Sequence, residues 1–216
     1  MDAKETRDQI VRDAKSSLIL DAALKMFAEK GFHETRLDDI AAAAGFSKAS
    51  LYNYYPDKEA IFLHILIRMH EKIIDALKAE IQNDRHIKDN LTAMVRAIFK
   101  IYNENFSFSF SMTDLKTMAP ISIEKFQKHH EQLMSRFKQH SMEMTELSVS
   151  VFSIAKRRGE IATQIEDRTL AQFVTSLMRG VLYDCKVAGK IGEIETHVQN
   201  IMEFLSNGLA FKKQPV

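Results

Sequence analysis

Apolar residues recur every three to four positions along most of this chain, which is the spacing of one face of an α-helix. The expected helices cover 13–30, 37–44, 48–55, 58–82, 87–103, 121–158 with a break near His140, 167–188 and 194–211. Alternation with a period of two, typical of strands, occurs at 106–111, but we find no second strand to pair with it. The chain has only seven Gly and three Pro, so long helices are favoured and we expect an all-α fold.

Residues that favour helix ends stand between the short segments. Gly45 follows the second helix, where a left-handed backbone is commonly needed. Thr35, three residues before Asp38, is expected to cap the second helix, and Ser47 is expected to cap the third. Asp57 is expected to cap the long fourth helix in the same way.

The two short helices have the residue types of a helix-turn-helix. Gly45 permits the turn between them, and the small Ala41 lets the second helix cross closely over the first. Ile40, Leu51 and Tyr55 are available for a shared core. An ordinary corner between two helices uses the same residue types, so geometry alone leaves both interpretations open.

The outward face of the third helix favours DNA binding. If Leu51 and Tyr55 pack inward, the residues that project outward or lie at the flanks are Lys48, Ala49, Ser50, Tyr52, Asn53 and Tyr54. Lys and Tyr can bind phosphate oxygens, Asn can pair with an adenine edge, and Ala can contact a thymine methyl group. The alternative is that the aromatic residues fill a small core, and we keep that interpretation for Tyr55.

Overall charge does not help to identify the partner. The chain is 45% hydrophobic and 27% charged, with a formal net charge of +1, as in ordinary soluble globular proteins. Residues 1–58 hold nine Lys or Arg against ten Asp or Glu, so a basic footprint must come from local placement and nonspecific affinity is expected to be modest. The residues available for it near the turn and at the amino end are Arg36, Lys48, Lys58, Arg7, Arg12 and Lys15.

Many residues stand in a specific order across the first three helices and the start of the fourth. They are Ile19-Leu20-Asp21-Ala22-Ala23, Phe27-Ala28-Glu29-Lys30-Gly31-Phe32, Thr35, Asp39-Ile40-Ala41, Ala44-Gly45-Phe46-Ser47-Lys48, Leu51-Tyr52-Asn53-Tyr54-Tyr55 and Lys58-Glu59. In this order, residues 15–65 resemble the amino-terminal domain of the TetR family of bacterial transcriptional repressors. The resemblance implies a dimer that binds double-stranded, pseudo-palindromic operator DNA with its third helix in the major groove.

The resemblance also implies roles for individual residues. Lys48, Ala49, Ser50, Tyr52 and Asn53 would face the bases or the nearby backbone, whereas Thr35, Arg36, Tyr54 and Lys58 would hold phosphates. Ala49 stands where Gly is common and Tyr55 where Phe is common, so the operator sequence does not follow from the resemblance. We place the DNA-binding domain at 1–56 and a larger effector-binding and dimerisation domain at 57–216, on helix length alone.

Aromatic and methionine side chains concentrate in the larger domain. Such side chains can line an adaptable apolar pocket, although for any single residue an ordinary helical core is the better-supported alternative. We expect a mostly apolar small-molecule effector. The residues expected to bind it are Phe99, Tyr102, Phe106, Phe108, Phe110, Met134 and Phe137.

The last two expected helices carry apolar stripes that suit either a core or a subunit interface. The resemblance implies a four-helix interface between two copies, and the small Gly180 would allow close approach. The residues assigned to this interface are Phe173, Leu177, Gly180, Val181, Val198, Ile201, Met202 and Leu205.

Other function classes receive little support from the sequence. The single Cys fits a reducing compartment, and no apolar run reaches the length of a membrane span, so we expect a cytoplasmic protein. No phosphate-binding glycine loop, nucleophile elbow or paired histidine motif occurs, so we expect neither enzymatic activity nor a cofactor or metal. The alternatives left open are an enzyme built on a helical bundle and an adaptor in which the domain at 1–56 is only a scaffold.

Overall fold

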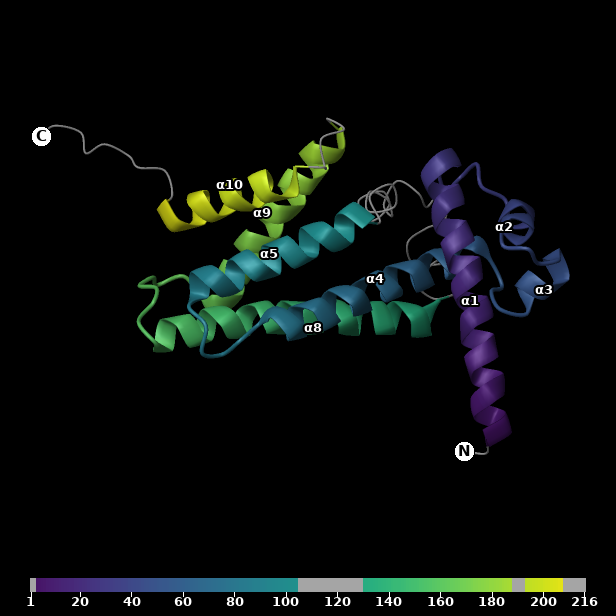
Figure 1. Cartoon of the computed structure of the whole chain (residues 1–216), viewed down its shortest axis with the longest axis horizontal. Helices are drawn as coiled ribbons and strands as arrows, with labels where there is room; N and C mark the ends of the chain where they lie inside the picture. The colour runs from purple at the N-terminus through teal and green to yellow at the C-terminus, as the bar shows by residue number, and fades with distance from the viewer. Residues whose placement is uncertain (1–2, 105–129, 188–192, 208–216) are drawn as a thin grey trace, which may run out of the picture. The chain divides into compact units, whose positions relative to one another are not determined.

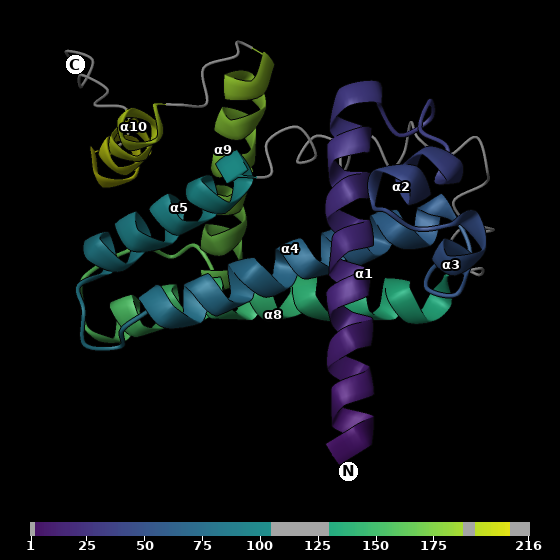
Figure 2. The ribbon, with the colours of Figure 1, turned by 45° about the vertical axis from the view of Figure 1, so that its right-hand side comes forward.

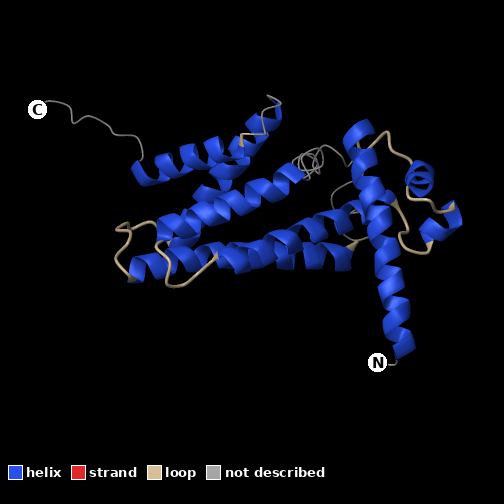
Figure 3. Cartoon of the chain, viewed as in Figure 1, coloured by secondary structure: helices blue, strands red, loops and turns tan. Residues whose placement is uncertain are grey.

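The computed structural model describes residues 3–104, 130–187 and 193–207, and every helix or strand assigned in these ranges is an α-helix (Figure 3). The helices are α1 (Ala3–Lys30), α2 (Leu37–Ala43), α3 (Lys48–Tyr52), α4 (Lys58–Glu80), α5 (Ile87–Glu104), α8 (Glu131–Arg157), α9 (Asp167–Val187) and α10 (Ile194–Asn207). The predicted all-α fold is confirmed. Within the described ranges, no helix has both the length and the apolar character needed to cross a bilayer.

Three helices differ from the predictions by more than two residues or in continuity. Helix α1 begins ten residues before position 13, because its early side chains are exposed and leave no apolar stripe for periodicity to detect. Helix α3 ends at Tyr52, three residues early, with Asn53 as its C-cap. The break expected near His140 is absent, since α8 contains no Gly or Pro to interrupt it. The expected first part of that helix, 121–129, lies outside the described residues.

The described chain forms two compact units. The first contains residues 3–69 and 130–138, and the second contains 70–104, 139–187 and 193–207. Helix α4 therefore has its residues 58–69 in the first unit and its residues 70–80 in the second. The first unit continues past Pro56 because Phe62 packs edge-on against Phe27 and Phe32. The division of the chain into functional domains at Pro56 stays a prediction.

In the first unit, α2 packs against α1 and α3 packs against α2 (Figure 1). Ile19 and Ala23 of α1 are fully buried, as are Ile40 of α2 and Leu51 of α3. The rings of Phe27 and Phe32 lie 5.1 Å apart between their centroids. The amino-terminal turns of α1 extend past α2 and α3 in both views (Figures 1 and 2).

In the second unit, α10 packs on α5, and α9 contacts both helices. Phe99 of α5 is fully buried, and the His197 ring of α10 stacks on it with centroids 6.2 Å apart. The Arg96 guanidinium holds Glu195 with two hydrogen bonds of 2.6 and 2.9 Å. Apolar burial and a bidentate ion pair therefore connect α5 with α10.

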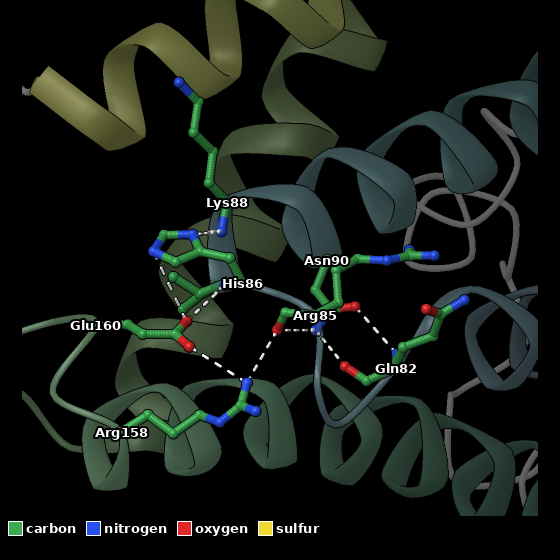
Figure 4. Close-up of polar contacts among 8 residues, drawn as sticks. Gln82, Arg85, His86, Lys88, Asn90, Arg158 and Glu160 are labelled. Carbon is green, nitrogen blue, oxygen red and sulfur yellow. Dashed lines mark hydrogen bonds and ion pairs between the residues drawn. The ribbon is translucent and has the colours of Figure 1, made fainter.

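A polar network ties the turn between α4 and α5 to the loop after α8 (Figure 4). The buried Asn90 amide accepts from the backbone N–H of Gln82 at 3.0 Å and donates to the carbonyls of Gln82 and Arg85 at 2.8 and 3.3 Å. Glu160 accepts from the backbone N–H of Ile87 at 2.7 Å. Because the first N–H groups of a helix lack partners inside the helix, Glu160 caps α5 from 73 residues away.

Candidate DNA-binding surface

The turn between α2 and α3 depends on a left-handed glycine. Gly45 has a φ of 76°, and its N–H donates to the carbonyl of Ala42 at 3.1 Å, while the N–H of Phe46 donates to that of Ala41 at 2.8 Å. These two bonds form a Schellman motif. A Cβ added at Gly45 would meet nothing within 4 Å, so backbone conformation rather than space calls for glycine.

The predicted shared core under this turn is present. Ile40, Ala41, Leu51 and Tyr55 are all buried. The Tyr55 hydroxyl lies 2.5 Å from the hydroxyl of Ser16 on α1, and burial raises the pKa of the Tyr55 phenol. Tyr55 is therefore a core residue with a hydrogen-bonded polar end, as the sequence interpretation held.

Helix α3 turns its polar face outward. Ser47 is its N-cap, as predicted, and its hydroxyl accepts from the backbone N–H of Ser50 at 3.2 Å. The exposed residues of the helix and its C-cap are Lys48, Ala49, Tyr52 and Asn53, with Ser50 and Tyr54 partly exposed. Tyr52 keeps 45% of its surface exposed although it is a large aromatic side chain. The arrangement suits insertion of α3 into a groove.

Lys48 is bound to an acidic side chain of the preceding helix. Its ammonium lies 2.9 Å from one carboxylate oxygen of Asp38 and 3.0 Å from the other. The hydrogen bond to Asp38 is the main cause that raises the pKa of Lys48. A phosphate that binds Lys48 must therefore share it with Asp38 or displace that carboxylate.

Thr35 has a different role from the two that were predicted. The N-cap of α2 is Arg36, with extended backbone and no side-chain capping bond. Thr35 is 1% exposed, and its hydroxyl donates to the carbonyls of Gly31 at 2.7 Å and Met26 at 3.3 Å. The Thr35 side chain therefore closes the end of α1, and the phosphate contact implied by the resemblance stays a prediction. Threonine can bond in either direction along the chain, and the sequence did not distinguish them.

The Lys58 ammonium is likewise hydrogen-bonded within the first unit. Asp57 caps α4 as predicted, accepting from the N–H of Ala60 at 2.7 Å. The Lys58 ammonium that follows donates to the carbonyls of Phe32, His33 and Thr35 at 2.9, 3.0 and 3.3 Å. These three bonds use the three donors of an ammonium group. A phosphate that binds Lys58 must therefore displace at least one of these carbonyls, and the phosphate contact implied by the resemblance stays a prediction.

Two further predicted contacts lie near α3 without a carboxylate partner in the described part of the chain. Arg36 is exposed, and its charge is close enough to Lys48 to oppose protonation of that lysine. Tyr54 follows α3, and its ring packs edge-on against Phe46 of the turn, with centroids 6.2 Å apart. Arg36 and Tyr54 border the exposed face of α3.

Comparison with known proteins agrees with this geometry. The family described as bacterial regulatory proteins, tetR family, matches residues 19–65, which contain α2, α3 and the first part of α4. Residues 19–65 of this chain therefore resemble the TetR family of bacterial regulatory proteins.

Relatives of this chain are named as regulators. The transcriptional regulator RutR of Escherichia coli K12 is 46% identical over 66 residues, which is 31% of this chain and 31% of RutR. The transcriptional repressor BepR of Brucella suis is 25% identical over 190 residues, covering 84% of this chain and 80% of BepR. The chain spans about a third of the length of RutR, and the names of both relatives agree with the prediction of a regulator.

A solved structure extends the similarity of fold to nearly the whole chain. The transcriptional regulator FadR of Bacillus subtilis, crystallised in complex with stearoyl-CoA, matches with a TM-score of 0.74 and 17% identity. The match covers 89% of this chain and 98% of FadR. The arrangement of a helix-turn-helix followed by a larger helical domain is therefore shared.

The residues predicted to bind an effector in this regulator fall into three groups. Phe106, Phe108 and Phe110 lie outside the described residues. Tyr102, Met134 and Phe137 are half-buried. Phe99 is fully buried under the His197 ring and belongs to the packing of α5 on α10. Phe99 therefore has the core role that the sequence left open as the alternative.

The predicted dimer residues of this chain differ by helix. Val198, Ile201 and Met202 of α10 are already buried within the second unit, where α10 packs on α5, so a core role explains their burial and their interface role stays a prediction. The α9 residues differ: Phe173 is 58% exposed, Gly180 is exposed, and Leu177 and Val181 are half-buried. Leu205 of α10 is half-buried. Apolar residues recur with the same helical spacing in α9 and in α10. Only the packing shows that α5 of the same chain covers the apolar face of α10.

Proposed function

We propose that this chain is a transcriptional repressor that binds a pseudo-palindromic operator as a homodimer, with α3 in the major groove. The observation that carries the proposal is the exposed face of α3, where Lys48, Ala49, Tyr52 and Asn53 surround a helix anchored by the buried Leu51. A hydrogen-bonding and apolar face of this size can contact base edges. Its surroundings supply phosphate-binding groups from Arg36 and Tyr54.

The dimer is proposed to form through the α9 face that contains Phe173, Leu177, Gly180 and Val181. Exposure of Phe173 and Tyr183 on one helix is unusual for a surface that faces only water. Gly180 has no atom within 4 Å of an added Cβ, which leaves room for a partner helix to approach. Two-fold symmetry would place the two α3 helices about 34–36 Å apart, or a multiple of that distance, to match successive major grooves.

The effector is proposed to be a mostly apolar small molecule that lowers operator affinity. A regulator of the same fold, FadR of Bacillus subtilis, has been crystallised with stearoyl-CoA, which supports an apolar effector. Helix α4 continues as one helix from the first unit into the second. A shift of its residues 70–80 would therefore also move its residues 58–69 in the first unit. A coupling of about 1–3 kcal/mol would lower operator affinity about 5- to 150-fold.

The test begins with DNA selection by the purified protein, followed by binding to the selected duplex and to an unrelated duplex of equal length. Preferential binding with two-fold symmetry in the selected sequence is expected. Stearoyl-CoA and free stearate are then titrated into the complex, with release of DNA as the signal. A chain that shows no preference for any duplex would exclude the repressor function.

A further inference from the structure

The Lys and Arg side chains of the first unit differ in whether they already bind a group of the protein. Five are bound to groups of the protein itself: Lys25 to Glu29, Lys30 to Asp39, Lys48 to Asp38, Arg68 to Asp21, and Lys58 to three carbonyls. A cation held in this way gives up an existing interaction when it binds a phosphate. Cations without such a partner are therefore the stronger candidates for DNA contacts beyond those already considered.

Arg12 of α1 is such a cation. Its side chain is exposed, and it forms no ion pair within the described part of the chain. The neighbouring carboxylate of Asp13 accepts a hydrogen bond from the Gln9 amide at 2.8 Å instead. The Arg12 guanidinium carbon lies 5.9 Å from the centroid of the Tyr54 ring, a distance at which the ring attracts a cation.

The position of Tyr54 connects Arg12 with the recognition surface. Tyr54 directly follows the C-cap of α3, and its N–H donates to the carbonyl of Leu51 at 2.9 Å. Its ring is supported on another side by Phe46, the residue after Gly45 in the turn. The backbone of α3 and the turn therefore fix the ring, and the ring holds the guanidinium beside the carboxyl end of α3.

We propose that Arg12 binds a backbone phosphate of the DNA that α3 contacts, and that Tyr54 positions it through their cation–π contact. The proposal rests on the proposed function, since it requires α3 to lie in the groove. A guanidinium presents paired N–H donors that match two phosphate oxygens, and a prior contact with a ring limits the freedom lost when the phosphate contact forms. Residues 3–12 lie before the part of α1 that matches the family, so the family match does not assign this contact.

The experiment compares Arg12→Gln with Lys25→Gln, which removes the same charge from the same helix at a position paired with Glu29. Binding of a fluorescein-labelled duplex, selected with the wild-type protein, is measured by anisotropy between 50 and 200 mM salt, together with an unrelated duplex. Each phosphate contact contributes about 0.9 to the slope of log affinity against log salt. Arg12→Gln is expected to flatten this slope by about 0.9 on both duplexes, and Lys25→Gln is expected to leave it nearly unchanged.

Tyr54 variants test the positioning step. In a Tyr54→Phe background the ring remains, so Arg12→Gln should flatten the slope as fully as in the wild type. In a Tyr54→Leu background the ring is lost, and Arg12→Gln should have a smaller effect. Circular dichroism confirms that each variant is folded before its slope is compared.

The outcomes separate this inference from the proposed function. If the wild type prefers its selected duplex but Arg12→Gln keeps the wild-type slope, the phosphate contact is overturned while the repressor proposal stands. The same holds if Arg12→Gln and Lys25→Gln flatten the slope equally, because the effect would then be general charge. If the wild type binds neither duplex, the proposed function and the inference fail together.

Discussion

The ammonium of Lys58 at the start of α4 donates a hydrogen bond of 2.9 Å to the carbonyl of Phe32. It also lies 4.7 Å from the centroid of the Phe32 ring. Phe32 follows α1, so Lys58 joins the end of the first helix to the beginning of the fourth. A residue that resembles a DNA contact in the sequence thus holds together the segment that leads into α2.

Replacement of Lys58 by Met should destabilise the protein more than it alters the salt dependence of DNA binding. Three bonds from a charged donor are lost and three carbonyls lose their partner, so we expect a cost of about 1.5–3 kcal/mol in the free energy of unfolding. Urea denaturation measures this cost, with Lys25→Met as the control. A Lys58→Met protein as stable as the wild type, but with a salt slope flatter by about one, would instead support a phosphate contact.

Two substitutions on α3 and its C-cap should separate sequence reading from positioning. Asn53→Ala is expected to cost about 1–3 kcal/mol at a single base pair and to relax the preference there, because a bidentate amide contact is removed. Lys48→Ala is expected to weaken binding to all sequences alike. The measurement is the affinity for a set of duplexes that differ by single base pairs. Equal losses on every duplex for Asn53→Ala would place that residue on the backbone instead.

Charged substitutions on α9 and α10 should have different consequences. Phe173→Asp is expected to give a folded monomer, because Phe173 is exposed in the single chain. Val198→Asp is expected to unfold the second unit, because Val198 is 1% exposed and a buried unpaired charge is very costly. Light scattering gives the oligomeric state and circular dichroism the helix content. A Phe173→Asp protein that remains dimeric would move the interface away from this face.

The buried His70 should make the protein less stable in acid. Burial, with a smaller contribution from His140, lowers the pKa of His70 from 6.5 to about 4. Between pH 6.5 and pH 4 the unfolded chain therefore binds a proton that the folded chain does not. Above pH 6.5 the protonation of His70 does not lower the free energy of unfolding, and as the pH falls toward 4 it lowers it progressively. The full loss is about 3 kcal/mol.

Urea denaturation of the wild type and of His70→Gln between pH 7 and pH 4 measures this dependence. The glutamine side chain does not titrate, so the variant should lose less stability than the wild type over the same range. His33→Gln, at an exposed position, is the control. Identical pH dependence of the wild type and His70→Gln would show that another group dominates.

Helix positions and the helix-turn-helix could be predicted because their causes are local. An apolar stripe needs only the spacing of residues along one helix, and Gly45 and Ser47 act on backbone groups within a few positions. The first ten residues of α1 were missed for the same reason, since they bury no face. Thr35 also acts locally, but its hydroxyl can bond forward or backward, and the choice depends on how the segment after α1 folds.

The sequence alone determined the all-α fold, the turn at Gly45 and the outward residues of α3, because each follows from short-range geometry. Only the tertiary structure decided that Lys58 binds carbonyls after the end of α1, that Val198 and Ile201 are buried where α10 packs on α5, and that Arg12 lies near the Tyr54 ring. These contacts join residues 26, about 100 and 42 positions apart. A side chain shows its type in the sequence, but its partner is set by the packing of distant helices.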